Sequence, residues 1–269
     1  MSTTNADKYL AHRYEGELPD LPMPDEPFVR EWEAWLNNPE GSDVPPTVKN
    51  TFFLSGDADF WLERTFAGRV PVGYARSRDG FKRLVNALYP GAGEIPASVN
   101  AFTIKSKRPE LEGHRVMLLG RAGYSALPAG DVKIPEEEWL EKSMTIRLNH
   151  EACHYFSLRA MGGMRNHALD EIAADCAGQL AAFGTFNAAL QRRFFGIADG
   201  KILSGGRFSF YVKTLDENAV SMVLEETDAA LSTLERYLLA NPDMTLKSNR
   251  PRLLMKLLSA GIQEIRELQ

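Results

Sequence analysis

Cysteine is scarce in this chain, because its 269 residues include only Cys153 and Cys176. Small secreted domains are held together by many disulfides, so two cysteines in a chain of this length argue against such a scaffold. The first twenty residues also lack the apolar stretch that a secretory signal requires. We therefore expect a reducing, cytoplasmic location, with both cysteines as buried small hydrophobic residues.

Long hydrophobic runs and an excess of positive charge are missing as well. The most apolar stretches are 144–190, which charged residues interrupt, and 253–260, which is too short to cross a bilayer. Lys and Arg total 31 against 36 Asp and Glu, and this net charge of −5 has the wrong sign for a broad phosphate-binding surface. The sequence therefore predicts no membrane span and no nucleic-acid partner, and it does not indicate an oligomeric state.

Proline is concentrated near the start of the chain. Seven prolines lie between residues 16 and 50, where they fix φ and remove amide donors too often for long regular elements. We expect residues 1–50 to form an extended arm with a disordered beginning, docked by its aromatic residues. Only residues 28–37, with Trp32 and Trp35, predict a short helix there.

The rest of the chain, 51–269, changes character near residue 135. β-Branched and aromatic stretches bounded by Gly or Pro predict strands at 69–75, 99–105 and 115–121. Stretches that begin with Asp predict short helices at 57–66 and 79–88. The part after residue 135 reads as helical apart from a Gly-rich passage, with a long helix beginning at 136 and amphipathic helices at 216–239 and 251–268.

This order of elements predicts an α+β fold. A small N-terminal sheet with short helices would form a lobe at 51–134, and a mainly helical lobe would follow at 135–269. The chain has enough apolar residues to form a hydrophobic core, because 44% of its residues are hydrophobic and 25% are charged. We expect the two lobes to make a single domain.

One short motif in the helical half indicates a metal-binding catalytic site. Residues 150–154 read His-Glu-Ala-Cys-His, which matches H-E-x-x-H. Residues four apart on a helix share one face, with Cβ atoms about 5–6 Å apart, so His150 and His154 can converge on one metal ion. Glu151 would accept a proton from the metal-bound water as that water attacks a carbonyl carbon. The alternative is a structural use, with both histidines hydrogen-bonded in a core.

A second set of polar residues follows a short turn at Gly162-Gly163, where the first helix ends and an antiparallel partner begins near Asn166. At about 1.5 Å per residue, His154 lies about 10 Å before the turn and Glu171 about 7 Å beyond it. A mainly apolar helix does not bury a carboxylate without a partner. We therefore assign Glu171 as the third protein ligand of a tetrahedral zinc whose fourth position is open to water.

Two further residues share the face of Glu171. Asp175 is placed to accept a hydrogen bond from the non-ligating ring nitrogen of His150 or His154, which would fix its tautomer; a surface charge is the alternative. His167 could replace Glu171 as a ligand, donate to the oxyanion formed during hydrolysis, or simply lie at the helix start. The sequence does not choose among other possible oxyanion or substrate groups, which are Tyr155, Arg165, Arg207, Tyr211 and His114.

Residues 150–154 and 171–175 together resemble the gluzincin group of zinc metallopeptidases, thermolysin-like in plan, with H-E-x-x-H on one helix and E-x-x-x-D on the next. The resemblance covers about residues 140–180. Sixteen residues separate His154 from Glu171, fewer than in thermolysin, which implies a shorter turn. A second zincin pattern, H-E-x-x-H-x-x-G-x-x-H, uses a third histidine as a metal ligand. This chain does not match it, because Ala160 stands where that histidine would be. The resemblance implies a zincin-like fold in which a sheet edge near the metal holds an extended peptide by strand addition.

These features predict a zinc-dependent, peptidase-like hydrolase that acts on a peptide or protein substrate of unknown identity. Zinc is preferred because imidazole and carboxylate ligands suit it. Two alternatives remain: a zinc-binding regulatory or interaction protein without turnover, and a metal-dependent hydrolase of a non-peptide amide or ester. We expect residues 16–50 of the arm and the Gly-rich passage at 196–207 to restrict access to the substrate-binding cleft of such an enzyme.

Overall fold

A computed structural model describes residues 4–269, which form two compact units. The first, which we call the sheet unit, is Asp20–Ala126. The second, the helical unit, joins Met1–Pro19, described from Thr4 onward, to Leu127–Gln269. The predicted α+β class, with a small sheet and a helical C-terminal half, is confirmed.

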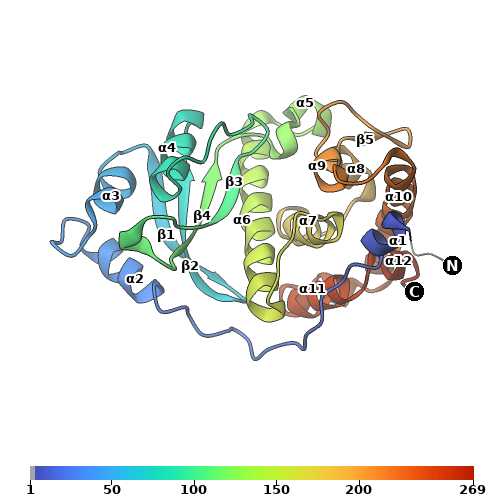
Figure 1. Ribbon diagram of the computed structural model, residues 1–269, viewed down its shortest axis with the longest axis horizontal. Helices are drawn as coiled ribbons and strands as arrows, with labels where there is room; N and C mark the ends of the chain where they lie inside the picture. Colours follow the sequence, from blue (N-terminus) through green and yellow to red (C-terminus); the bar gives the residue numbers. More distant parts are fainter. Residues whose placement is uncertain (1–3) are drawn as a thin grey trace. The chain divides into compact units, whose positions relative to one another are not determined.

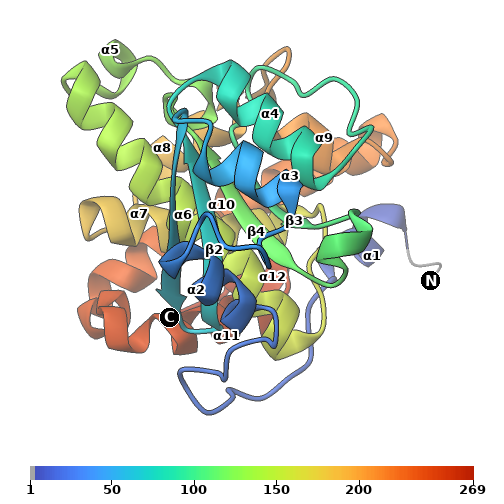
Figure 2. The same cartoon turned by 90° about the vertical axis from the view of Figure 1, so that its left-hand side faces the viewer.

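The sheet unit is built on a four-stranded mixed sheet with the order β1-β2-β4-β3 (Figures 1 and 2). β2 pairs with β1 antiparallel and with β4 parallel, and β3 pairs antiparallel with β4. β1 and β3 are therefore its edges. The strands are β1 (Ala58–Thr65), β2 (Gly68–Ala75), β3 (Ala101–Lys105) and β4 (Arg115–Gly120). The helical segments are α2 (Val29–Asn37), α3 (Pro46–Val48), η1 (Lys49–Phe53), α4 (Arg78–Leu88), η2 (Pro109–Leu111) and η3 (Tyr124–Ala126).

Amphipathic spacing explains the core of the sheet unit. α4 buries Phe81, Leu84, Val85 and Leu88, which recur at helical spacing, and it contacts β2 and β4. Ser77 caps this helix by accepting a hydrogen bond from the Gly80 amide. The predicted helix at 79–88 and the three predicted strands are confirmed within a few residues.

The predicted helix at 57–66 is wrong, because this segment is strand β1. A two-residue connection joins β1 to β2, and the Thr65 hydroxyl accepts a hydrogen bond from the Ala67 amide within it. Gly68, with φ +92°, supplies the left-handed backbone that the turn requires. Aromatic and β-branched residues such as Trp61 favour helix only weakly, so ladder pairing with β2 prevails.

The helical unit gathers most of the helices of the described chain. Its α-helices are α1 (Asn5–Leu10), α5 (Ala129–Val132), α6 (Glu136–Met161), α7 (Ala168–Phe183), α8 (Ala188–Phe195), α9 (Phe208–Val212), α10 (Glu217–Ala240), α11 (Arg250–Ser259) and α12 (Ile262–Arg266). The short elements are β5 (Ile197–Ala198), β6 (Lys201–Ile202), η4 (Pro242–Thr245) and η5 (Lys247–Asn249). The predicted helix at 251–268 is thus divided in two near Gly261.

α6 and α7 form the predicted helical hairpin and lie side by side (Figure 1). Gly162, in the left-handed conformation with φ +69°, ends α6. Gly178 of α7 lies so close to α6 that a Cβ atom there would come within 2.9 Å of the Ile146 carbonyl oxygen. The two helix backbones therefore approach closely one turn from His150.

The N-terminal segment differs from the predicted arm. Residues 5–10 form α1, whose Thr4–Asp7 capping box satisfies the first turn, and α1 packs beside α10. Its Ala6 and Leu10 are buried, and this burial explains why residues 5–10 form a packed helix. The first three residues of the predicted disordered beginning lie outside the described residues. Residues 20–50 belong instead to the sheet unit, where Trp32 and Trp35 of α2 join the core as expected.

No helix within residues 4–269 combines the length and the apolar character needed to cross a membrane.

Candidate metal centre

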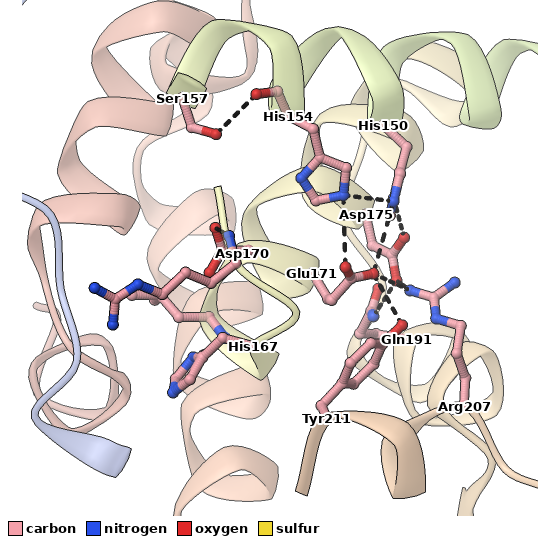
Figure 3. A network of polar contacts seen from close by, with 12 residues as sticks. His150, His154, Ser157, His167, Asp170, Glu171, Asp175, Gln191, Arg207 and Tyr211 are labelled. Atoms are coloured by element: carbon pink, nitrogen blue, oxygen red, sulfur yellow. Dashed lines mark hydrogen bonds and ion pairs between the residues drawn. The ribbon is translucent and has the colours of Figure 1, made fainter. Parts of the chain in front are cut away.

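The two histidines of the H-E-x-x-H motif lie on consecutive turns of α6, with ring centroids 4.5 Å apart. Glu171, in the first turn of α7, faces both rings (Figure 3). One ligand atom from each of His150, His154 and Glu171 lies within 4.8 Å of the other two, and all three residues are buried. The hairpin therefore brings together the three residues that the sequence assigns as metal ligands.

The donor atoms are spaced as ligands of one ion would be. The two Nε2 atoms of His150 and His154 are 2.9 Å apart. The Glu171 carboxylate places Oε2 3.6 Å from the first Nε2 and Oε1 3.5 Å from the second. Ligands about 2.0–2.1 Å from a tetrahedral zinc lie about 3.4 Å from one another. The residues present fit such an ion with small side-chain adjustments, and three protein ligands leave one position for water or substrate.

Asp175 fixes the orientation of the His150 ring. Its Oδ1 lies 2.7 Å from Nδ1 of His150, and the carboxylate is fully buried. A carboxylate can only accept here, so the imidazole donates from Nδ1 and keeps the lone pair on Nε2, the nitrogen that faces His154. The predicted hydrogen bond to Asp175 is thus present, and His150 donates it.

A chain of buried amides supports Asp175 from α8. Gln191 Nε2 donates to Asp175 Oδ2 at 2.6 Å, and Gln179 Nε2 donates to Gln191 Oε1 at 2.9 Å. The Asn187 amide in turn donates to Gln179 Oε1 at 2.9 Å. Both glutamines are fully buried. These residues are not among those singled out from the sequence, although a glutamine within an otherwise apolar helix, such as Gln179, is a signal of a buried polar network.

Arg207 and Tyr211 reach the site from the segment that contains α9. The Arg207 guanidinium forms ion pairs with Asp175 and with Glu171 Oε2, the second at 3.4 Å. The Tyr211 hydroxyl donates to Glu171 Oε2 at 2.9 Å. The Gly-rich passage allows this approach, because a Cβ atom on Gly206 would lie 2.8 Å from the Gly196 carbonyl oxygen. The close approach of these two glycines thus places Arg207 beside Glu171 and Asp175.

The buried charges of the site are paired. Burial lowers the pKa of His154, but the hydrogen bond and the charge of Glu171 raise this pKa by more, so it lies above its ordinary value. Burial raises the pKa of Glu171, but His154, His150 and Arg207 lower it by more. The two shifts agree on an imidazolium beside a carboxylate. A metal ion needs the same nitrogen lone pair, so an ion bound at His154 would displace this proton.

Residues 106–268 match a family of unknown function, DUF7005. The chain belongs to this family. The match covers more than half of the chain and includes every residue of the site described above. No match was found among curated proteins or among solved structures.

Glu151 of this DUF7005 protein lies beside the ligand set on α6. It is 6% exposed, and its charge is among the influences that raise the pKa of His154. Its carboxylate is not part of the group of three ligand residues. This placement is compatible with a carboxylate that acts next to a metal without holding it.

His167 lies at the start of α7, which was one of the three alternatives for it. Its Nδ1 accepts a hydrogen bond from the Leu169 amide, and its Nε2 lies 3.1 Å from the Tyr9 carbonyl oxygen. Burial and the charge of His12 lower its pKa to about 3, so the ring is neutral. The ligand group of α6 and Glu171 does not include it.

Of the other possible oxyanion or substrate groups in this DUF7005 chain, some contact Glu171 and others lie elsewhere. Arg207 and Tyr211 contact Glu171, whereas Arg165 contacts Asp170 and His12. Tyr155 is fully buried with Arg159 over its ring. His114 belongs to the core of the sheet unit, where Trp32 donates to its Nδ1.

The two cysteines are free and buried, as the sequence predicts. Burial raises the pKa of Cys153 well above its ordinary value and that of Cys176 to about 12. Both thiols are therefore protonated at neutral pH and behave as small hydrophobic side chains.

Proposed function

We propose that this DUF7005 protein is a zinc-dependent hydrolase of the metallopeptidase type. The observation that carries the proposal is the buried group of His150, His154 and Glu171, with the carboxylate of Glu151 next to it on the same helix. A bound zinc would supply Lewis-acid polarisation of a carbonyl and would lower the pKa of water. The fold we propose is zincin-like, and the location we propose is the cytoplasm.

Each residue then has a distinct part. His150, His154 and Glu171 hold the metal, and Asp175 keeps the Nδ1 proton of His150 directed away from it. Glu151 accepts a proton from the water that attacks the substrate carbonyl and passes it to the leaving amine. Arg207 and Tyr211 are the nearest positively charged and hydroxyl groups to Glu171, so they are our candidates to donate to the developing oxyanion.

Peptides are the substrate class we propose, because this set of residues activates water against an amide carbonyl and the H-E-x-x-H and E-x-x-x-D pattern is that of metallopeptidases. A regulatory zinc protein would not need Glu151. A hydrolase of another amide or ester would use the same residues on a different substrate.

The test is cleavage of a fluorogenic peptide library by zinc-loaded wild type, Glu151→Gln and Glu141→Gln. Glu141 lies on the exposed face of the same helix, so the control makes the same chemical change away from the site. We expect Glu151→Gln to bind zinc normally and to lose at least about 100-fold in kcat, the scale of a general-base contribution, while Glu141→Gln matches wild type.

Equal cleavage by all three proteins would refute the role of Glu151. Zinc bound with no cleavage of peptides by wild type would instead favour the regulatory alternative, or the non-peptide one if a panel of other amides and esters is hydrolysed.

A further inference from the structure

A second group of metal-ligating side chains lies at the start of α7, outside the site described above. It consists of His12, His167 and Asp170, with one ligand atom from each within 4.8 Å of the other two. Asp170 is 1% exposed and His167 is 7% exposed. His12 comes from the N-terminal segment, so the cluster joins parts of the chain that are far apart in sequence.

Two atoms of this cluster lack a hydrogen-bond partner. Nε2 of His12 and Oδ2 of Asp170 are buried and unpartnered within residues 4–269. They lie 3.9 Å apart, too far for a hydrogen bond. Burying two polar atoms without partners is costly, so such a pair calls for an explanation.

A metal ion between these two atoms would satisfy both. Donors about 2.1 Å from one ion are separated by about 3.4 Å at a tetrahedral angle and by about 4.2 Å when opposite each other. The observed separation of 3.9 Å falls within this range. The other carboxylate oxygen of Asp170 is already used, because it accepts from the Tyr14 hydroxyl at 2.6 Å and from the Arg165 amide at 3.2 Å.

His167 is oriented as a metal-ligating histidine commonly is. Its Nδ1 accepts from the Leu169 amide, so Nε2 carries the hydrogen and donates to the Tyr9 carbonyl at 3.1 Å. Histidine ligands typically donate their other ring nitrogen to a carbonyl or carboxylate in this way. Ligation through Nδ1 would replace one capping hydrogen bond, from the Leu169 amide, with the metal.

One positive charge faces the cluster. The Arg165 guanidinium lies 3.5 Å from Nδ1 of His12. Arg165 is an exposed residue, so its side chain can turn toward water when a cation binds. The carboxylate of Asp170 supplies the negative charge of the ligand set.

We propose that His12, His167 and Asp170 form a second metal site, for a divalent ion that accepts imidazole and carboxylate ligands, such as Zn²⁺. The ion fastens the N-terminal segment to the first turn of α7. Because Asp170 directly precedes Glu171, the same ion steadies the turn that presents the third ligand of the first site.

The test is Co²⁺ binding, followed by visible absorption and titration calorimetry, to four proteins: wild type, His154→Ala, His12→Ala and the double variant. Wild type should bind two equivalents, each single variant one, and the double variant none. In the His154→Ala background, the added His12→Ala change should weaken Co²⁺ binding by at least about 100-fold. Arg13→Ala, which removes the neighbouring exposed side chain, is the matched control and should bind two.

The decisive protein is His154→Ala, because it leaves every residue of the second site intact. If it binds no Co²⁺ while wild type binds one equivalent, the second site does not exist and the first does. If it keeps one equivalent and His12→Ala binds none, the second site exists and the first does not. Circular dichroism confirms that each variant is folded, and Asp170→Asn replaces His12→Ala if that protein is not.

Discussion

Asp175 determines which nitrogen of His150 faces the proposed metal position. It accepts from Nδ1 of that ring and is itself held by Gln191 and Arg207. We predict that Asp175→Asn weakens zinc binding by about 10- to 100-fold. A neutral amide accepts the hydrogen bond from Nδ1 of His150 less strongly than a carboxylate does, so it orients the imidazole less well. Competition with a chromophoric chelator measures the Kd. The control is Asp228→Asn, which removes a carboxylate paired with Arg192 instead; an equal loss in both variants would contradict the account.

His114 makes the stability of the sheet unit depend on pH. Its ring stacks on Phe28 and Trp35, and its Nδ1 accepts from the Trp32 indole at 3.2 Å. Burial lowers its pKa below the ordinary value of 6.5, and the negative charge of the exposed Glu31 opposes this shift. The unfolded chain therefore binds a proton more readily than the folded chain does, and stability falls as the pH drops below about 6.5.

Urea unfolding followed by tryptophan fluorescence tests this dependence, because Trp32, Trp35 and Trp61 all lie in the sheet unit. We predict that wild type loses free energy of unfolding between pH 6.5 and 5. His114→Gln, which can still accept from the indole but does not titrate, should show a flatter dependence. The same slope in both proteins would rule out His114 as the cause.

The residues of the metal centre could be predicted further than their surroundings. His150, His154, Glu171 and Asp175 could be singled out from the H-E-x-x-H motif, from helical spacing and from the cost of burying an unpaired carboxylate, because these signals are local in the sequence. Gln191 and Arg207 could not be placed, since they reach the site through tertiary packing of α8 and a Gly-rich passage that no local pattern encodes.

The contact between α6 and α7 decides whether the ligands meet. Gly178 faces the Ile146 backbone, and a Cβ atom there would lie 2.8 Å from the Ile146 Cγ2 atom. We predict that Gly178→Ala forces the helices apart, destabilises the protein by about 1–3 kcal/mol and weakens zinc binding. Gly130→Ala in α5 is the control, because a Cβ atom there meets nothing within 4 Å.

Thermal unfolding and zinc titration of both alanine variants check this prediction. The control should be neutral or slightly stabilising, since alanine favours helix over glycine. If Gly178→Ala binds zinc as tightly as wild type, the close approach is not needed to align His150 with Glu171.

Element prediction succeeded where one local signal dominated. α4 and α10 have clear caps and apolar faces and lie close to their predicted bounds, and α7 begins near Asn166 as predicted. The prediction for 57–66 was wrong because the strand there depends on pairing with β2. The short, capped helix at 5–10 was not predicted because the many prolines farther along indicated an extended arm.

At the scale of the whole molecule, the predicted order of sheet first and helices second is confirmed. Residues 4–19 group with the helical unit and 20–50 with the sheet unit, whereas the sequence suggests one arm over 1–50. No local sequence pattern predicts that Tyr14 contacts Asp170. Contacts between residues this far apart in sequence depend on the complementarity of the packed surfaces and not on local periodicity.

Metal removal should destabilise the helical unit selectively. A ligand at 100 times its Kd adds about 2.7 kcal/mol to the stability of the state that binds it. We predict that zinc slows amide hydrogen exchange in α6 and α7 and that a chelator reverses this, with β1–β4 unchanged. The His12→Ala/His154→Ala double variant should not respond to zinc; a response of equal size there would place binding elsewhere.

The most direct test of the central claim is diffraction from crystals of the zinc-loaded protein, measured at the zinc absorption edge. We expect an anomalous peak from a zinc ion about 2.0–2.2 Å from each of three atoms: Nε2 of His150, Nε2 of His154 and a carboxylate oxygen of Glu171. A fully zinc-loaded crystal with no peak within bonding distance of these atoms would contradict it.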